Sequence, residues 1–169
     1  MGYDRPYTRE EIHQMLCLSE RRPRPSSPVA TAHAGHAISR HTEQRDNPFD
    51  RRQIRQDSTF ATRKDLVLAV QEALHDPKGQ QELATLNAHN VSGCAITVQL
   101  SAGLGKIKAN VVRNPMARVG NQWVPSQGPQ HYLTHALVTS VFVLVDKVLP
   151  AQTWAPLHIQ TAYPKDIAP

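Results

Sequence analysis

Histidine and arginine side chains lie close together early in this sequence, where His36 and His41 are five residues apart with Arg40 between them. Histidine takes up and releases protons near neutral pH because its unperturbed pKa is about 6.5. Arginine presents a planar fork that matches the oxygens of a phosphate. Two hydroxyl-bearing residues, Thr161 and Tyr163, stand near the other end of the chain. These residue types fit proton transfer at a phosphate ester.

Cleavage of RNA without a metal needs such a set. A base takes the proton from the 2′-hydroxyl, an acid protonates the departing 5′-oxygen, and a cation stabilises the charge on phosphorus. His36, Arg40, His41 and Arg52 could supply these groups from the first third of the chain. Thr161 and Tyr163 would hold a phosphate oxygen or a base edge.

The other motifs favour neither a metal site nor a cofactor. Histidines recur three apart at His33 and His36, and four apart at His131 and His135. No cysteine or glutamate completes a ligand set at recognised spacing, and glycine-rich nucleotide loops are absent. The two cysteines cannot form a disulfide framework or a four-cysteine zinc site.

Positive charge is concentrated in one segment. Residues 21–64 carry ten basic and four acidic side chains, whereas the net charge of the whole chain is +5. A concentrated basic segment indicates a polyanionic partner. No apolar run approaches the length of about 20 residues that a membrane helix needs, and the first residues do not form a signal peptide.

Several helices can be predicted from their caps. Thr8 and Glu11 form a capping box for a helix through Ser19, and a proline-rich linker follows over residues 21–28. Ala37 to about Arg45 and residues 49–55 fit short helices, residues 47–48 fit a turn or the start of the second helix, and residues 57–60 fit an extended turn. Caps at Thr62 and Asp76 predict two more helices.

Strands are expected in the second half of the chain. Residues 94–100 alternate between apolar and polar, 107–112 form a second strand, 114–129 a polar loop, and 137–148 a central strand. Helices followed by strands predict an α+β fold with the helices packed on an antiparallel sheet.

The last strand, residues 157–163, determines which side chains share a face. Regular alternation puts Thr161 and Tyr163 on one face with Leu157 and Ile159. His158 then faces the other way, with Gln160 and Ala162, unless a bulge changes its direction.

Four segments resemble, in order, the bacterial ribonuclease A-like toxin domains found at the C-termini of contact-dependent growth inhibition proteins and other polymorphic toxins. Residues 35–41 (Gly-His-Ala-Ile-Ser-Arg-His) resemble the family's G-H-T-I-x-R-H stretch, and an arginine follows eleven residues later at Arg52. Residues 57–60 (Asp-Ser-Thr-Phe) resemble its Ser-Ser-Phe segment before a helix. Residues 160–164 (Gln-Thr-Ala-Tyr-Pro) resemble its final strand.

The resemblance implies a ribonuclease A-like fold without the disulfide framework over residues 33–169, after a helical and Pro/Arg-rich leader and linker over 1–32. It implies that the catalytic residues are His41, Arg52, Thr161 and Tyr163. His36, Arg40, Arg51 and Ser58 are expected to bind the substrate. His36 remains an alternative to His41 as the main catalytic histidine, and Arg51 an alternative to Arg52.

The implied activity is that of a metal-independent, cofactor-free endoribonuclease toxin that leaves 2′,3′-cyclic phosphate ends. Its partners would be RNA, with tRNA as one candidate, and an acidic immunity protein. We expect a monomer, secreted or delivered by a specialised system and active in the cytoplasm of the target cell. Two alternatives are a non-catalytic module that binds nucleic acid or an acidic protein through residues 40–64, and a toxin of other chemistry such as a nucleotide-dependent transferase.

Overall fold

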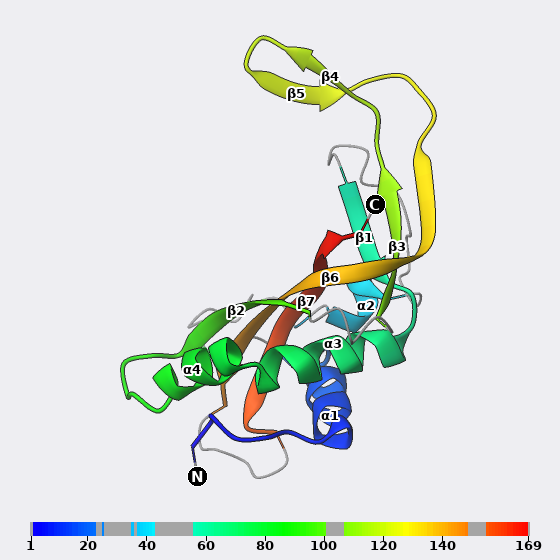
Figure 1. Ribbon diagram of the computed structural model, residues 1–169. Coiled ribbons are helices and arrows are strands. Elements are labelled where there is room, and N and C mark those ends of the chain that lie inside the picture. Colours follow the sequence, from blue (N-terminus) through cyan, green and yellow to red (C-terminus); the bar gives the residue numbers. More distant parts are fainter. Residues whose placement is uncertain are drawn as a thin grey trace.

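The computed structural model describes residues 2–22, 25, 35, 37–42, 56–100, 107–148 and 155–168. Its elements are α1 (Arg9–Ser19), α2 (Ala37–His41), β1 (Gln56–Phe60), α3 (Arg63–His75), α4 (Pro77–Thr85), β2 (Gly93–Gln99), β3 (Lys108–Arg113), β4 (Met116–Val119), β5 (Gln122–Pro125), β6 (His131–Lys147) and β7 (Leu157–Ile167). All the strand pairings among the described residues are antiparallel. The predicted α+β class is confirmed, with a curled antiparallel sheet and a few helices (Figure 1).

The helices begin where their caps predict. The Thr8 hydroxyl accepts a hydrogen bond from the Glu11 N–H at 3.2 Å, and the Glu11 carboxylate accepts one from the Thr8 N–H at 2.7 Å. This capping box satisfies two backbone donors that the first turn of α1 leaves without partners. Thr62 caps α3 by accepting from the Asp65 N–H at 3.1 Å, and Asp76 caps α4.

The long strand β6 is the centre of the main sheet, as predicted. The sheet has the order β1-β3-β6-β2, and β7 also pairs with β6. The first half of β6 pairs with β3, and its second half pairs with both β2 and β7. β6 can serve three partners because it has 17 residues, which is several times the usual strand length.

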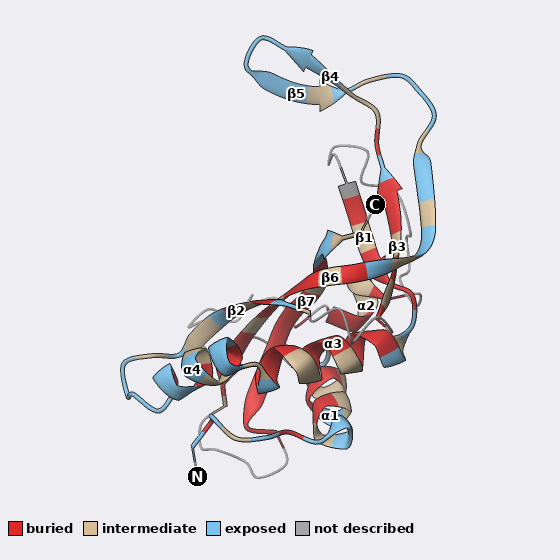
Figure 2. Ribbon diagram, in the orientation of Figure 1, coloured by how far each residue is buried: buried red, intermediate tan, exposed pale blue. Residues whose placement is uncertain are grey.

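One face of this sheet forms the hydrophobic core with the helices. Ile96, Val143 and Ile159 come from three neighbouring strands, and Leu66 and Leu74 come from α3; each of these side chains is 0 % exposed. Figure 2 shows the buried residues running along β6, β7 and the inner sides of α1 and α3. Removal of this apolar surface from water is the main source of stability.

The predicted leader helix α1 is part of this core. Ile12, Met15 and Leu16 on α1 are buried in the same cluster as the residues of the sheet. The predicted boundary near residue 32 lies outside the described residues, so the division at that point stays a prediction. The helix before it nevertheless shares the core of the body.

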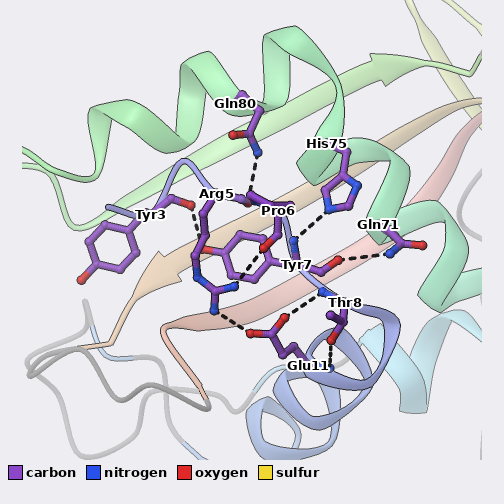
Figure 3. Close-up of polar contacts among 9 residues, drawn as sticks. All are labelled: Tyr3, Arg5, Pro6, Tyr7, Thr8, Glu11, Gln71, His75 and Gln80. Carbon is purple, nitrogen blue, oxygen red and sulfur yellow. Dashed lines mark hydrogen bonds and ion pairs between the residues drawn. The ribbon is translucent and has the colours of Figure 1, made fainter. Parts of the chain in front are cut away.

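The segment before α1 is fixed to α3 by its backbone (Figure 3). The Tyr7 N–H donates to His75 Nε2 at 2.9 Å, and the Gln71 amide donates to the Tyr7 carbonyl at 3.1 Å. The Tyr7 hydroxyl donates to the Tyr3 carbonyl at 2.7 Å. Burial raises the pKa of Tyr7 to about 12, because the phenolate would lose its hydration.

The order of elements differs from the prediction in one place. Residues 57–60 were expected to form a turn, but Gln56–Phe60 form strand β1, which pairs with β3. The prediction was wrong because Asp57, Ser58 and Thr59 are residues typical of turns, whereas the pairing with β3 satisfies their backbone groups. The aromatic side chain of Phe60 is buried, as expected. A strand therefore lies between α2 and α3, and the helices do not all come first.

The expected polar loop at 114–129 contains a β-hairpin. Strands β4 and β5 pair with each other in a separate two-stranded sheet. Gly120 has a φ of 61° in the turn that joins them, a conformation that glycine adopts without strain. Of the two earlier segments read as short helices, the first is α2, which ends at His41, and residues 43–55 lie outside the described residues.

Candidate functional site

A β-bulge in β7 determines the direction of the predicted site residues. In the register with β6, Ile159 lies opposite Val145 and Thr161 lies opposite Leu144. One step on β6 therefore corresponds to two on β7, and Gln160 is the extra residue. A bulge of this kind changes the face to which the following side chains point.

The bulge reverses the predicted alternation. Directly opposite residues of an antiparallel pair share a face, so Leu157 and Ile159 share the core face with Val145, whereas Thr161 shares the other face with Leu144. Tyr163 lies opposite Phe142 on that second face. The prediction that Thr161 and Tyr163 lie on the face of Leu157 and Ile159 was therefore wrong, because period-two counting takes no account of an inserted residue.

His158 also lies on the second face, opposite Asp146. Regular alternation had placed it away from Thr161. Its side chain is 3 % exposed, and its Nε2 lies 3.3 Å from Gln160 Oε1. The structure therefore adds His158 to the face that carries Thr161 and Tyr163; the residue types gave no signal of the bulge.

The structure brings His41 against Tyr163. Their ring centroids are 5.6 Å apart with planes tilted by 42°, and Tyr163 stacks on Phe142 with centroids 5.0 Å apart. Contacts of this kind hold aromatic rings in a defined orientation. A histidine 122 residues before Tyr163 in the sequence therefore lies beside it in the fold, as the proposed site requires.

The end of α1 holds α2 in this position. The Glu20 carboxylate accepts a hydrogen bond from the Ile38 N–H at 2.7 Å, at the start of α2. The Ser19 hydroxyl accepts one from the Ile159 N–H at 2.8 Å, and the Ser19 carbonyl accepts one from the Gly35 N–H at 2.8 Å. The chain before α2, the end of α1 and the bulged part of β7 are therefore joined through Ser19.

Thr161 has an uncommon environment for a hydroxyl group. Its side chain is only 8 % exposed, and in the described part of the chain its Oγ1 has no hydrogen-bond partner. A buried polar atom in this state costs about 1–3 kcal/mol. Such atoms are rare in folded proteins and often have a functional reason.

The other predicted residues divide into two groups. Ser58 donates a hydrogen bond to the Pro164 carbonyl at 3.0 Å, so its hydroxyl joins β1 to β7 next to Tyr163. Arg40 is exposed on α2, beside His41 in the sequence. His36, Arg51 and Arg52 lie outside the described residues, and their roles stay predictions.

A basic groove lies between α1 and α3, and neither His41 nor Tyr163 lines it. The groove is open to solvent and has a volume of about 330 Å³. Its lining residues are Arg9, Glu10, His13, Arg63, Lys64, Val67 and Leu68. Arg63 and Lys64 belong to the basic segment that the sequence singled out, but Arg9 and His13 were not predicted, because only the packing of α1 against α3 brings them there.

No protein-family model, curated protein or solved structure matches the chain. Within the described ranges, no three His, Cys, Asp or Glu side chains are grouped so that they could hold a metal ion. None of the described helices is long and apolar enough to span a membrane. Cys17 and Cys94 are both free thiols, and burial raises the pKa of Cys94 to about 11.

Proposed function

We propose that this chain is a metal-independent endoribonuclease of the ribonuclease A-like toxin type, which cleaves RNA to leave 2′,3′-cyclic phosphate ends. The observation that carries the proposal is the contact between His41 and Tyr163, on the sheet face that also bears the buried hydroxyl of Thr161. An imidazole beside a phenol, on a sheet face that also carries a threonine hydroxyl, fits a reaction that moves protons at a phosphate.

In the proposed reaction His41 takes the proton from the 2′-hydroxyl. The 2′-oxygen then attacks the adjacent phosphorus, and the bond from phosphorus to the 5′-oxygen breaks. The leaving oxygen receives a proton from an acid, for which Tyr163 and the alternative histidine His36 are the candidates. The products are a 2′,3′-cyclic phosphate and a 5′-hydroxyl.

The charge that develops on the phosphate needs donors. Among the described residues the Thr161 hydroxyl has no hydrogen-bond partner, so it could donate a hydrogen bond to a non-bridging oxygen. Arg52 is the proposed phosphate arginine, with Arg51 as the alternative, and a guanidinium fits this task because it binds two oxygens at once. Arg40 and Ser58 would contact the RNA on either side, although the bond from Ser58 to the Pro164 carbonyl also gives it a structural role.

The proposed function includes a ribonuclease A-like fold, an immunity protein and delivery to a target cell. A ribonuclease A-like arrangement is supported by helices packed on a curled antiparallel sheet whose last strand carries site residues. A cell that makes such an enzyme needs an inhibitor, and the basic segment favours an acidic immunity protein, because complementary charge speeds association. Delivery from the producing cell and action in the cytoplasm of a target cell complete the proposal.

The decisive experiment is digestion of total RNA and tRNA in EDTA, with chemical analysis of the fragment ends. The wild-type protein should produce cyclic phosphate ends, and His41→Ala should cut at least about 100-fold more slowly, the usual contribution of a general base. His89→Ala is the matched control, because His89 is an exposed histidine outside the site. Equal cleavage by wild type and His41→Ala would contradict the assignment.

The second candidate is a binding module that does not cut. The groove lined by Arg63 and Lys64 favours this candidate, because its basic side chains could bind a polyanion without taking part in a reaction. Under this reading the folded protein leaves every RNA intact in EDTA but retains salt-dependent binding, and Arg63→Gln and Lys64→Gln weaken that binding while His41→Ala does not.

A further inference from the structure

The hairpin of β4 and β5 projects from the body of the molecule (Figure 1). In the described residues its two strands pair only with each other. The turn contains Gly120 and Asn121, and only Gly120 has a positive φ. This is the pattern of a type II′ turn, which matches the twist of hairpin strands. The hairpin is therefore regular structure, although it is not part of the core.

Hydrogen bonds fix the base of the hairpin. The Gln130 amide donates to Asn114 Oδ1 at 2.6 Å, and the Tyr132 hydroxyl donates to Gln130 Oε1 at 2.7 Å. The Ser126 N–H donates to the Pro115 carbonyl at 3.0 Å. The bonds from Gln130 to Asn114 and from Ser126 to Pro115 join the two chain segments that enter and leave the hairpin, and the bond from Tyr132 holds the Gln130 side chain.

The hairpin exposes large apolar side chains. Trp123 is 57 % exposed and Val119 is 63 % exposed, and Tyr132 at the base is 57 % exposed. Figure 2 shows most of β4 and β5 as exposed. Burial within this chain therefore does not explain the tryptophan, which is a large residue with a high cost of exposure.

A cation lies beside the exposed tryptophan. Arg118 on β4 is directly opposite Trp123 on β5, so both side chains are on the same face of the hairpin. No aspartate or glutamate occurs in the sequence between Glu82 and Asp146. An arginine beside an exposed aromatic ring, in a segment without acidic residues, is the arrangement that binds single-stranded nucleic acid: bases stack on the ring, and phosphates meet the cation.

We propose that the hairpin is an arm that binds the RNA substrate at a distance from the cleavage site, with Trp123 stacked on a base and Arg118 on a neighbouring phosphate. The proposal rests on the proposed function for the identity of the ligand. Phe142 at the site is ten residues along β6 from Tyr132 at the base of the arm, a path of up to about 33 Å at about 3.3 Å per residue. RNA that reaches both the arm and the cleaved bond must span a distance of this order, so the arm meets RNA several nucleotides from the cleaved bond.

The test measures binding and cleavage separately. For binding, His41→Ala prevents cleavage and Trp154→Phe leaves Trp123 as the single tryptophan, since the chain has two. Trp123 fluorescence is then followed in EDTA with two single-stranded RNAs. The long RNA exceeds the predicted distance from the arm to the cleavage site, and the short RNA covers less than half of that distance. Variants Trp123→Ala and Arg118→Gln, followed with end-labelled RNA, are compared with Gln122→Ala, an exposed residue on the opposite face of the hairpin.

Long RNA should quench Trp123. Trp123→Ala should weaken long-RNA binding by about five-fold or more, the loss expected for one stacked base, and Arg118→Gln should reduce the salt slope of binding by about 0.7. Short RNA and Gln122→Ala should give the wild-type values. Unchanged long-RNA affinity in Trp123→Ala would overturn the proposal, as would self-association through the hairpin in place of RNA binding.

The two proposals fail in different ways. If the wild-type protein cuts no RNA but long RNA still quenches Trp123, the catalytic proposal fails and the arm stands. If the wild-type protein cuts RNA and the arm variants cut long and short substrates at the wild-type rate, the arm fails and the catalytic proposal stands.

Discussion

Replacement of Thr161 by valine should separate activity from stability. The hydroxyl of Thr161 is buried at 8 % exposure and has no hydrogen-bond partner among the described residues. Desolvation of such a group without a partner costs about 1–3 kcal/mol. Valine has nearly the same shape, favours strands and carries no polar atom, so Thr161→Val removes most of this cost.

We therefore expect Thr161→Val to raise the free energy of unfolding by about 1 kcal/mol, which corresponds to an increase of about 2–4 °C in Tm for a chain of this size. Cleavage should fall in the same variant. A lost donor to a developing oxyanion typically lowers kcat by about 100-fold or more, with little change in KM, because that hydrogen bond strengthens only in the transition state.

Urea unfolding followed by circular dichroism measures the first effect, and RNA cleavage in EDTA measures the second. Ser140→Ala is the matched control, since the Ser140 hydroxyl is also buried without a hydrogen-bond partner in the described chain. Ser140 lies four residues along β6 from Leu144, the residue opposite Thr161, about 13 Å away. The Ser140→Ala variant should not lose stability and should keep full activity.

Two results would refute this reasoning. A Thr161→Val variant that is less stable than wild type would mean that the hydroxyl makes a favourable interaction in the folded protein. A variant that is more stable and fully active would mean that the Thr161 hydroxyl has no role in cleavage, and Thr161 would no longer be assigned to the proposed site.

Three further changes test the contacts of the segment before α1 and of the chain around α2. Burial raises the pKa of Tyr7 from 10.0 to about 12. The contribution of this shift to the free energy of unfolding is therefore complete below pH 10 and is lost as the pH rises towards 12. Urea titrations across this range should show a smaller loss of stability for Tyr7→Phe than for wild type. Glu20→Ala removes the acceptor at the start of α2 and should lower cleavage by loosening His41, whereas Glu20→Gln should largely restore it. Gly35→Ala would place a Cβ 2.7 Å from the Ile159 carbonyl oxygen and should cost about 1–3 kcal/mol by thermal unfolding.

Local signals predicted the helices well. The caps at Thr8, Thr62 and Asp76 depend on side chains within three residues of the helix start, and each helix begins where its cap indicates. The central position of β6 could be predicted because both of its faces are apolar. Strand β1 could not, since Asp57 and its polar neighbours become a strand only through pairing with a segment about 50 residues later.

The hairpin was missed for a different reason. Gly120 and Asn121 are a known turn signal between two short segments, but those segments lack the regular alternation that usually marks strands. Most of their residues are exposed, so burial did not impose a pattern on the sequence. Exposed strands are therefore harder to predict from the pattern of hydrophobic residues than strands in a core.

The bulge at Gln160 connects the sequence motif of β7 to the geometry of the candidate site. If Gln160 occupied a regular position in the ladder, Thr161 and Tyr163 would continue the face of Leu157 and Ile159 and point into the core. A tyrosine there would need more volume than a packed interior provides. With the bulge, Ala162 takes the core position opposite Val143, where it is 0 % exposed, and Tyr163 meets His41. The order Thr-Ala-Tyr therefore suits both faces of β7. The small Ala162 fits the core, and Thr161 and Tyr163 lie on the face of the candidate site.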